Sequence, residues 1–309
     1  MNYVTRKGGA TVTIFVPYDC NNHCPFCINK EEYKDTSNFN IDEIIKSIRI
    51  MNILTPECDV VFTGGEPLAN LTVLDRLLRE VHSGRTLITR RHKVFINTSL
   101  PVSDKCDIYR LAQQLNDWYR VGYITGINVS RHLHKYVQEC SDDIFNELCF
   151  QPRINCVLYN LQLAANNLDE MLINFVERFK DITGYIQFRK DYVVTTPENL
   201  YDEKNDKILN KLKKVFKYKK RFGEYRMRVG YEFDYKGYKI TYHKTLPYSK
   251  IKLNENEYVL YDIIIKQDGT IREDWDTCST VTFNNRKSDI IANELDLTAY
   301  RRVRYEEYK

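Results

Sequence analysis

Long apolar runs, net charge and closely spaced cysteines are all scarce in this chain of 309 residues. No segment approaches the roughly 20 apolar residues that a membrane-spanning helix needs. The start of the chain, Met1 to Ala10, lacks the long apolar segment of a secretory signal. The formal net charge is only +4, which is too small to predict a nucleic-acid partner. We therefore expect a cytoplasmic protein that binds neither membrane nor nucleic acid.

What the chain does contain is typical of a folded globular protein. Hydrophobic residues make up 43% and charged residues 28%, a balance that argues against disorder. Nine cysteines in a reducing compartment suggest metal binding more than disulfides. Only three of them, Cys20, Cys24 and Cys27, lie close together in the sequence. The other six are scattered: Cys58, Cys106, Cys140, Cys149, Cys156 and Cys278.

Short β-rich runs alternate with helical patterns through the first two thirds of the chain. The predicted strands are 11–16, 59–62, 94–96, 123–129, 154–158 and 185–188. The segments between them show helical periodicity, and Asn40 followed by Glu43 resembles the start of a helix with a capping box. This alternation predicts an α/β fold with parallel strands, a partial (βα)6 TIM-like barrel with a C-terminal β-rich cap. Residues 1–196 would form the barrel core.

The segment after this core is basic and then rich in aromatic residues. Thr196 followed by Pro197 predicts the start of a helix, and we expect one basic amphipathic helix over 197–223. Its lysine face is either a solvated surface or an attractor for an anionic substrate or an acidic electron donor. Residues 224–309 would form the cap and tail, with a hairpin turn at Asp268-Gly269. The tyrosines there would form the core of a small sheet or close over the barrel mouth.

The spacing Cys20-x-x-x-Cys24-x-x-Cys27 follows directly after the first predicted strand. Three thiolates in so short a loop can converge on a [4Fe–4S] cluster and leave one iron without a protein ligand. A zinc site is the alternative, although structural zinc wants four protein ligands. His23, beside Cys24, is badly placed to supply the fourth one.

Together with Phe26 before the last cysteine, this triplet resembles the signature of the radical S-adenosylmethionine (SAM) superfamily. The resemblance implies that SAM binds to the open iron and is cleaved there to methionine and a 5′-deoxyadenosyl radical. That radical would abstract a hydrogen atom from the substrate. A one-electron donor such as flavodoxin or ferredoxin is implied as a partner.

The segment Thr63-Gly64-Gly65-Glu66-Pro67 follows the second predicted strand and resembles the Gly-Gly-Glu-Pro element of the same superfamily. There the glycines and the glutamate hold the amino group of SAM, which agrees with close backbone approach at glycine and with a carboxylate–ammonium pair. A plain turn followed by a helix start is the alternative interpretation.

Polar residues at later strand ends are further candidates. The resemblance suggests that Asn97 and Ser130 contact SAM, Ser130 through the ribose, and that Arg131 pairs with the SAM carboxylate. Ser130 as a helix cap and Arg131 as a solvated side chain are the alternatives. Asn155 and Arg189 could also point into the barrel mouth, or could be satisfied structural groups. No residue is assigned to catalysis from the sequence.

The substrate is left open at this stage. We expect a small molecule, with nucleotides and natural-product precursors among the candidates. The alternative is a protein or peptide substrate, as for a glycyl-radical activase or a peptide modifier. Beyond Cys156 the only cysteine is Cys278, so no second cluster is predicted, which counts against peptide-maturing members with auxiliary clusters. A structural zinc module for protein interaction is the hypothesis from another class.

Overall fold

The structure is a computed structural model that describes most of the chain. The described residues are 2–5, 11–17, 19–27, 35–54, 59–85, 93–101, 107–134, 136–159, 166–191, 194–223, 228–246, 250–255, 257–272 and 295–300. Cys58, Cys106 and Cys278 lie outside them.

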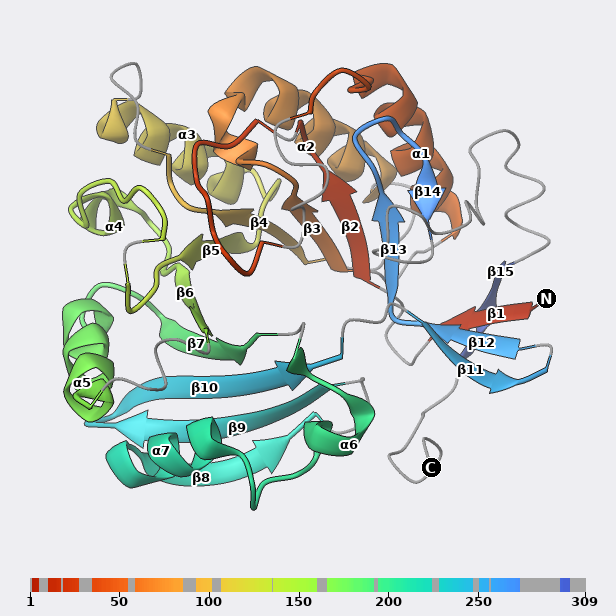
Figure 1. Cartoon of the computed structure of the whole chain (residues 1–309). Coiled ribbons are helices and arrows are strands. Elements are labelled where there is room, and N and C mark those ends of the chain that lie inside the picture. The colour runs from red at the N-terminus through yellow and green to blue at the C-terminus, as the bar shows by residue number, and fades with distance from the viewer. Residues whose placement is uncertain are drawn as a thin grey trace.

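Six parallel strands in sequence order form the middle of one large curved sheet (Figure 1). They are β2 (Thr11–Phe15), β3 (Asp59–Thr63), β4 (Val94–Thr98), β5 (Gly126–Ser130), β6 (Arg153–Leu158) and β7 (Tyr185–Lys190). Each is hydrogen-bonded in parallel to the next. All six predicted strands and their parallel order are therefore confirmed, and the sheet is the partial barrel that the sequence predicts.

Strands from the C-terminal third extend this sheet at both edges, giving eleven strands in all. β10 (Tyr238–Thr245) pairs in parallel with β7, and β13 (Asp262–Ile265) pairs in parallel with β2. Antiparallel partners then follow: β9 (Arg228–Tyr235), β8 (Lys217–Phe222) and β14 (Ile271–Arg272). The predicted antiparallel hairpins exist, but these strands continue the core sheet instead of forming an appendage upon it.

Helices cover the outer, convex side of the sheet (Figure 1). They are α1 (Ile41–Leu54), α2 (Leu71–Arg85), α3 (Ile108–Arg120), α4 (Ile144–Glu147), α5 (Leu168–Phe179), α6 (Pro197–Leu200) and α7 (Lys207–Val215), with the 3₁₀ turn η1 (Pro67–Ala69) before α2. The predicted cap of α1 is present, because Asn40 Oδ1 accepts a hydrogen bond from the Glu43 backbone N–H. Their apolar stripes meet the strands in one hydrophobic core that runs from Val12 to Ile271.

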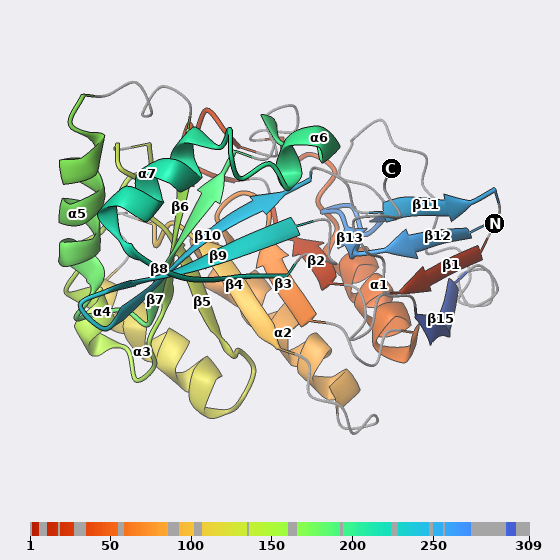
Figure 2. The same ribbon diagram turned by 90° about the horizontal axis from the view of Figure 1, so that it is seen from below.

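A second, four-stranded sheet lies at the other end of the molecule from α5 and α7 (Figure 2). Its strands are β11 (Lys250–Asn254), β12 (Glu257–Leu260), β1 (Asn2–Thr5) and β15 (Leu295–Tyr300). None of the helices in the described ranges is long and apolar enough to cross a membrane.

The single basic helix predicted over 197–223 is wrong in extent. The chain forms the short helix α6, a turn, the helix α7 and then the strand β8. Thr196 does cap α6 with a capping box, as the sequence indicates. A second cap follows at Asp206, whose side chain accepts from Leu209 N. Because a capping aspartate has a non-helical backbone, one continuous helix cannot pass through it.

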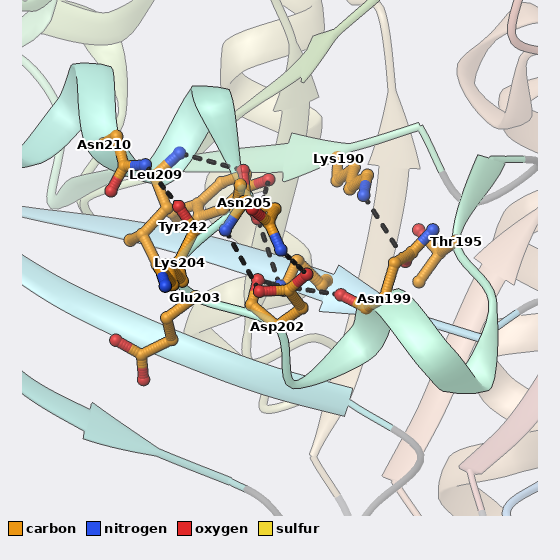
Figure 3. Close-up of polar contacts among 12 residues, drawn as sticks. Lys190, Thr195, Asn199, Asp202, Glu203, Lys204, Asn205, Leu209, Asn210 and Tyr242 are labelled. Atoms are coloured by element: carbon orange, nitrogen blue, oxygen red, sulfur yellow. Dashed lines mark hydrogen bonds and ion pairs between the residues drawn. The ribbon is translucent and has the colours of Figure 1, made fainter.

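A buried ion pair fastens this segment to the sheet, and Figure 3 shows the polar contacts around it, with Asn199, Asp202 and Tyr242 labelled. Lys244 of β10 is fully buried, and its Nζ lies 3.1 Å from Asp206 Oδ2. The same ammonium donates to the backbone carbonyls of Asn199 and Asp202. The Tyr242 hydroxyl donates to Asp206 as well. A buried charge with this many partners is a strong structural restraint, so β10 and the α6–α7 turn are held as one unit.

Candidate functional site

Two loops meet at the carboxyl ends of β2 and β3. The loop after β2 carries the three closely spaced cysteines, and the loop after β3 carries Gly64, Gly65 and Glu66. Backbone hydrogen bonds join them: Val16 N donates to Thr63 O at 2.9 Å, and the two glycine-loop amides of residues 65 and 66 donate to the carbonyls of residues 17 and 19. The two motifs, some forty residues apart in the sequence, therefore form one surface.

The three cysteines are free and partly exposed. A turn joins two of them, with Cys27 N donating to Cys24 O at 3.0 Å. Burial raises the pKa of the Cys24 thiol to about 12, and the neighbouring thiols Cys27 and Cys20 act in the same direction. Burial likewise raises the pKa of Cys20, with Glu66 and Cys27 adding to the effect. The thiols are thus close enough to oppose one another's ionisation, which a bound cation would reverse.

This donor set fits an iron–sulfur cluster, for which soft thiolates are the usual ligands. Among the described residues, no group of three or more His, Cys, Asp or Glu side chains is arranged around a single metal ion. A cubane binds its thiolates on separate irons, so it does not require Cys20, Cys24 and Cys27 to converge on one point.

Phe26 holds the cysteine loop against the next strands. Its ring lies 4.7 Å from the His132 ring, 5.6 Å from Tyr136 and 6.1 Å from Tyr159. His132 is buried, and burial followed by the charge of Arg131 lowers its pKa to about 3. Its Nδ1 accepts a hydrogen bond from the Val157 backbone. Phe26 is therefore packed on a neutral structural histidine.

Residue 64 must be glycine because the two loops approach each other closely at this position. Its φ is +126°, and a Cβ at this position would lie 2.6 Å from Val16 O. Only glycine adopts this conformation without strain and allows the approach. The group that approaches Gly64 closely in this structure is the backbone of Val16.

Glu66 is buried and accepts four hydrogen bonds. The donors to its carboxylate are Leu68 N, Thr98 Oγ1, and both the backbone N–H and the hydroxyl of Ser99. Burial raises the pKa of Glu66, while the hydrogen bonds from Ser99, Thr98 and Leu68 act to lower it. Two carboxylate oxygens offer about four acceptor positions, and here all are used. Glu66 thus ties the ends of β3 and β4 together.

A hollow opens between the two motifs, of about 350 Å³ counted out to its open side. It is lined by Asp19, Cys20, Asn21, Asn22, Glu66, Ala69, Ser99, Pro101 and Gln138. Asn22 bridges its walls, because its amide donates to Ser99 Oγ and accepts from Gln138 N. No sequence signal marks Gln138, whereas Asn22 lies inside the cysteine motif and Ser99 directly follows a strand.

Comparison with known families agrees with the motifs. Residues 7–100 match the family described as a 4Fe-4S single cluster domain, and this region contains Cys20, Cys24, Cys27 and the glycine loop. That match covers less than a third of the chain and agrees with the cysteine motif. It shows similarity to a domain that holds a [4Fe–4S] cluster. Membership of the radical SAM superfamily, with SAM as the second cofactor, is what the two motifs imply.

The other two comparisons add less. No curated protein matches the chain. Among solved structures it resembles a histidine-tagged form of anSMEcpe with bound AdoMet, at 18% identity and a TM-score of 0.45, over 64% of this chain and 54% of that one. It also resembles native anSMEcpe with bound AdoMet and the Kp18Cys peptide, at 17% identity and a TM-score of 0.47, over 69% and 59%. The chain thus spans little more than half of these proteins, and likeness at this level carries no argument about its substrate.

The remaining predicted SAM contacts differ in accessibility. Asn97 accepts a hydrogen bond from the Asn128 amide at 2.7 Å, and Ser130 is partly exposed at the end of β5. Both lie near the strand ends that carry the motifs, and their contact with SAM stays a prediction.

Arg131 does not fit its predicted role. Its side chain is fully buried and donates to the carbonyls of Ser99 and Ser130. It also lies 3.8 Å from Glu139 and over the Phe145 ring. Neither the predicted pairing with the SAM carboxylate nor the alternative of a solvated side chain describes a guanidinium enclosed in this way. Arg131 instead fixes the loop that carries Ser99.

Proposed function

We propose that this chain is a radical SAM enzyme, that it binds SAM in the hollow between Cys20 and Glu66, and that it acts on a small-molecule substrate. The observation that supports this most is that a single hollow is lined by a cysteine of the triplet and by the glutamate of the glycine loop. Cys20, Cys24 and Cys27 would hold the cluster, which would supply one electron for reductive cleavage of SAM to methionine and a 5′-deoxyadenosyl radical able to take hydrogen from the substrate.

The residues of the hollow would orient SAM and exclude water from it. The amino group of SAM would meet the carboxylate of Glu66 by replacing one donor, for which the Ser99 hydroxyl is suited because it can rotate. Asn97 and Ser130 would contact the rest of SAM from the ends of β4 and β5. Asn22 and Gln138 both line the hollow, and Gln138 N donates a hydrogen bond to Asn22.

The substrate would lie on the concave side of the sheet, beyond the motif strands. A small molecule suits a surface lined by single polar side chains from successive strands. A peptide is the alternative substrate class. A flavodoxin or ferredoxin as electron donor and a cytoplasmic location remain predictions.

The test is anaerobic reconstitution followed by reduction in the presence of SAM. We expect about four irons and four sulfides per chain, and 5′-deoxyadenosine and methionine as products by mass spectrometry. Replacing Cys20, Cys24 and Cys27 together by Ala should abolish both the iron and the products. Cys149→Ala is the matched control, because Cys149 is a free, exposed cysteine outside the triplet. Full product formation by the triple variant would overturn the proposal.

A further inference from the structure

From β6 to β9, one face of the sheet packs on helices and the other face carries charged side chains. Side chains alternate along a strand, and those that point toward the helices are identified by their contacts. Phe188 of β7 packs on Phe175 of α5, and Tyr242 of β10 bonds to Asp206 at the start of α7. The alternate residues, including Arg189 and His243, therefore point to the concave side.

This concave side carries an accumulation of positive charge. Register places Arg189 opposite His243 on neighbouring strands, and Arg153 and Arg228 come from the flanking strands β6 and β9. The buried imidazole of His243 lies within electrostatic range of each of these cations. Its pKa is lowered well below the ordinary value, first by burial and then by the charges of Arg228, Arg189, Arg153 and Lys239.

Arg153 is held rigidly and lacks an anion. Its guanidinium lies 5.6 Å from the Phe95 ring centroid and 5.7 Å from that of Tyr185, whose hydroxyl accepts from it. Within the described ranges Arg153 has no carboxylate partner, and its buried Nε has no hydrogen-bond partner. A positioned guanidinium without a counter-ion is ready to bind an oxyanion.

Two further buried polar atoms lie on the same side without partners. They are Thr241 Oγ1 on β10 and Asn155 Oδ1 on β6, and Thr241 is only 2% exposed. Register aligns both with Gln187 of β7, the strand between them. Buried polar atoms are nearly always satisfied, so this row indicates a place where a bound molecule completes the hydrogen bonds.

One carboxylate on this side pairs with lysines. Glu232 of β9 lies 3.4 Å from Lys239 and 3.9 Å from Lys220. It therefore offsets the lysines at the edge of the sheet. The lysines of α7 pair with Asp169 and Glu203 on the outer side. One interpretation of the sequence is that these lysines attract an anion.

We propose that this surface, formed by Arg153, Arg189, Arg228, Thr241 and His243 and here called the arginine face, binds a phosphate group of the substrate. The inference rests on the proposed function and names the substrate class of that site. Guanidinium groups bind phosphate oxygens in a fork geometry, and the buried, neutral imidazole adds a donor without adding charge. The motif strands β2 to β5 are left to SAM, so substrate and SAM would be held by neighbouring halves of the same sheet.

The test is calorimetric titration of the cluster-loaded protein, saturated with SAM under anaerobic conditions, with inorganic pyrophosphate. We expect one binding event that weakens about ten- to a hundredfold in Arg153→Gln, Arg189→Gln or Arg228→Gln, since each removes a charge-assisted contact. Thr241→Val keeps every charge and should weaken binding about two- to tenfold. Lys214→Gln on α7, where the lysine side chain is 72% exposed, should bind like wild type.

Several outcomes would overturn the phosphate assignment. One is no pyrophosphate binding to the wild type, and another is equal loss in Lys214→Gln. Citrate binding as tightly as pyrophosphate would assign the face to a carboxylate. Binding that disappears when SAM is added would assign it to SAM itself. If an arginine variant does not retain its iron, the pyrophosphate affinity of Thr241→Val tests the phosphate assignment instead. Formation of 5′-deoxyadenosine is measured separately, so failure of the arginine face and failure of the radical SAM proposal are distinguished.

Discussion

Replacing Glu66 by Ala should affect stability and SAM binding while sparing the cluster. The carboxylate accepts four hydrogen bonds. The hydroxyls of Thr98 and Ser99 can rotate to new partners, but the backbone N–H groups of Leu68 and Ser99 cannot. Each buried donor left without a partner costs about 1–3 kcal/mol, so the free energy of unfolding should fall by about 2–6 kcal/mol. SAM affinity should fall by about 1.5–3 kcal/mol from the lost charge-assisted bond.

The iron content should stay near that of the wild type. The cysteine loop is joined to the glycine loop by backbone bonds, Glu66 N to Asp19 O and Gly65 N to Pro17 O, which alanine preserves. Urea unfolding followed by circular dichroism under anaerobic conditions measures the stability, and equilibrium dialysis measures SAM. Glu147→Ala is the control, because Glu147 is exposed and its loss should change stability by at most about 0.5 kcal/mol. If Glu66→Ala unfolds at the same urea concentration as the wild type, the carboxylate does not join β3 to β4.

Three further predictions concern buried groups. Lys244→Met should lower the free energy of unfolding by about 3–5 kcal/mol, because it leaves Asp206 charged and buried; an unchanged urea midpoint would contradict this. Gly64→Ala should reduce both stability and iron content, since its Cβ would meet Val16 O; normal iron loading would refute the close approach. The pKa of His132 is lowered to about 3, so the unfolded chain takes up this proton first as pH falls below about 6.5. Stability should therefore drop by about 1.4 kcal/mol per pH unit below that value, and His132→Gln should remove this slope from urea midpoints measured between about pH 5 and 7.

The two halves of the sheet divide the proposed work. The loops after β2 and β3 form the hollow, and β4 and β5 supply the further SAM candidates. The arginine face is built from β6, β7, β10 and β9. Because parallel strands bring their carboxyl ends to one edge, a substrate held on one half can present its reactive carbon to SAM on the other. In this proposal the strands from beyond residue 224 would contribute to the substrate side as part of the sheet.

The sequence by itself determined the six strands with their parallel order, and it predicted the cluster ligands and the glycine loop. These features depend on local information: the spacing of Cys20, Cys24 and Cys27, the pair Gly64-Gly65, and apolar runs that alternate with helical periods. Local capping also correctly marked the starts of α1 and α6. Local sequence patterns are enough to predict the order of strands when strands that are consecutive in the sequence are also adjacent in the sheet.

Only the tertiary structure decided which polar residues are enclosed and which strands lie together. Arg131 follows a strand end, as a ligand residue would, yet the packing of residues 139–145 over it removes it from the site. Arg153, Arg189 and Arg228 are far apart in the sequence, and they lie on one face of neighbouring strands because β10 returns to pair with β7. Burial and strand pairing depend on contacts between distant segments, which no local pattern of residues encodes.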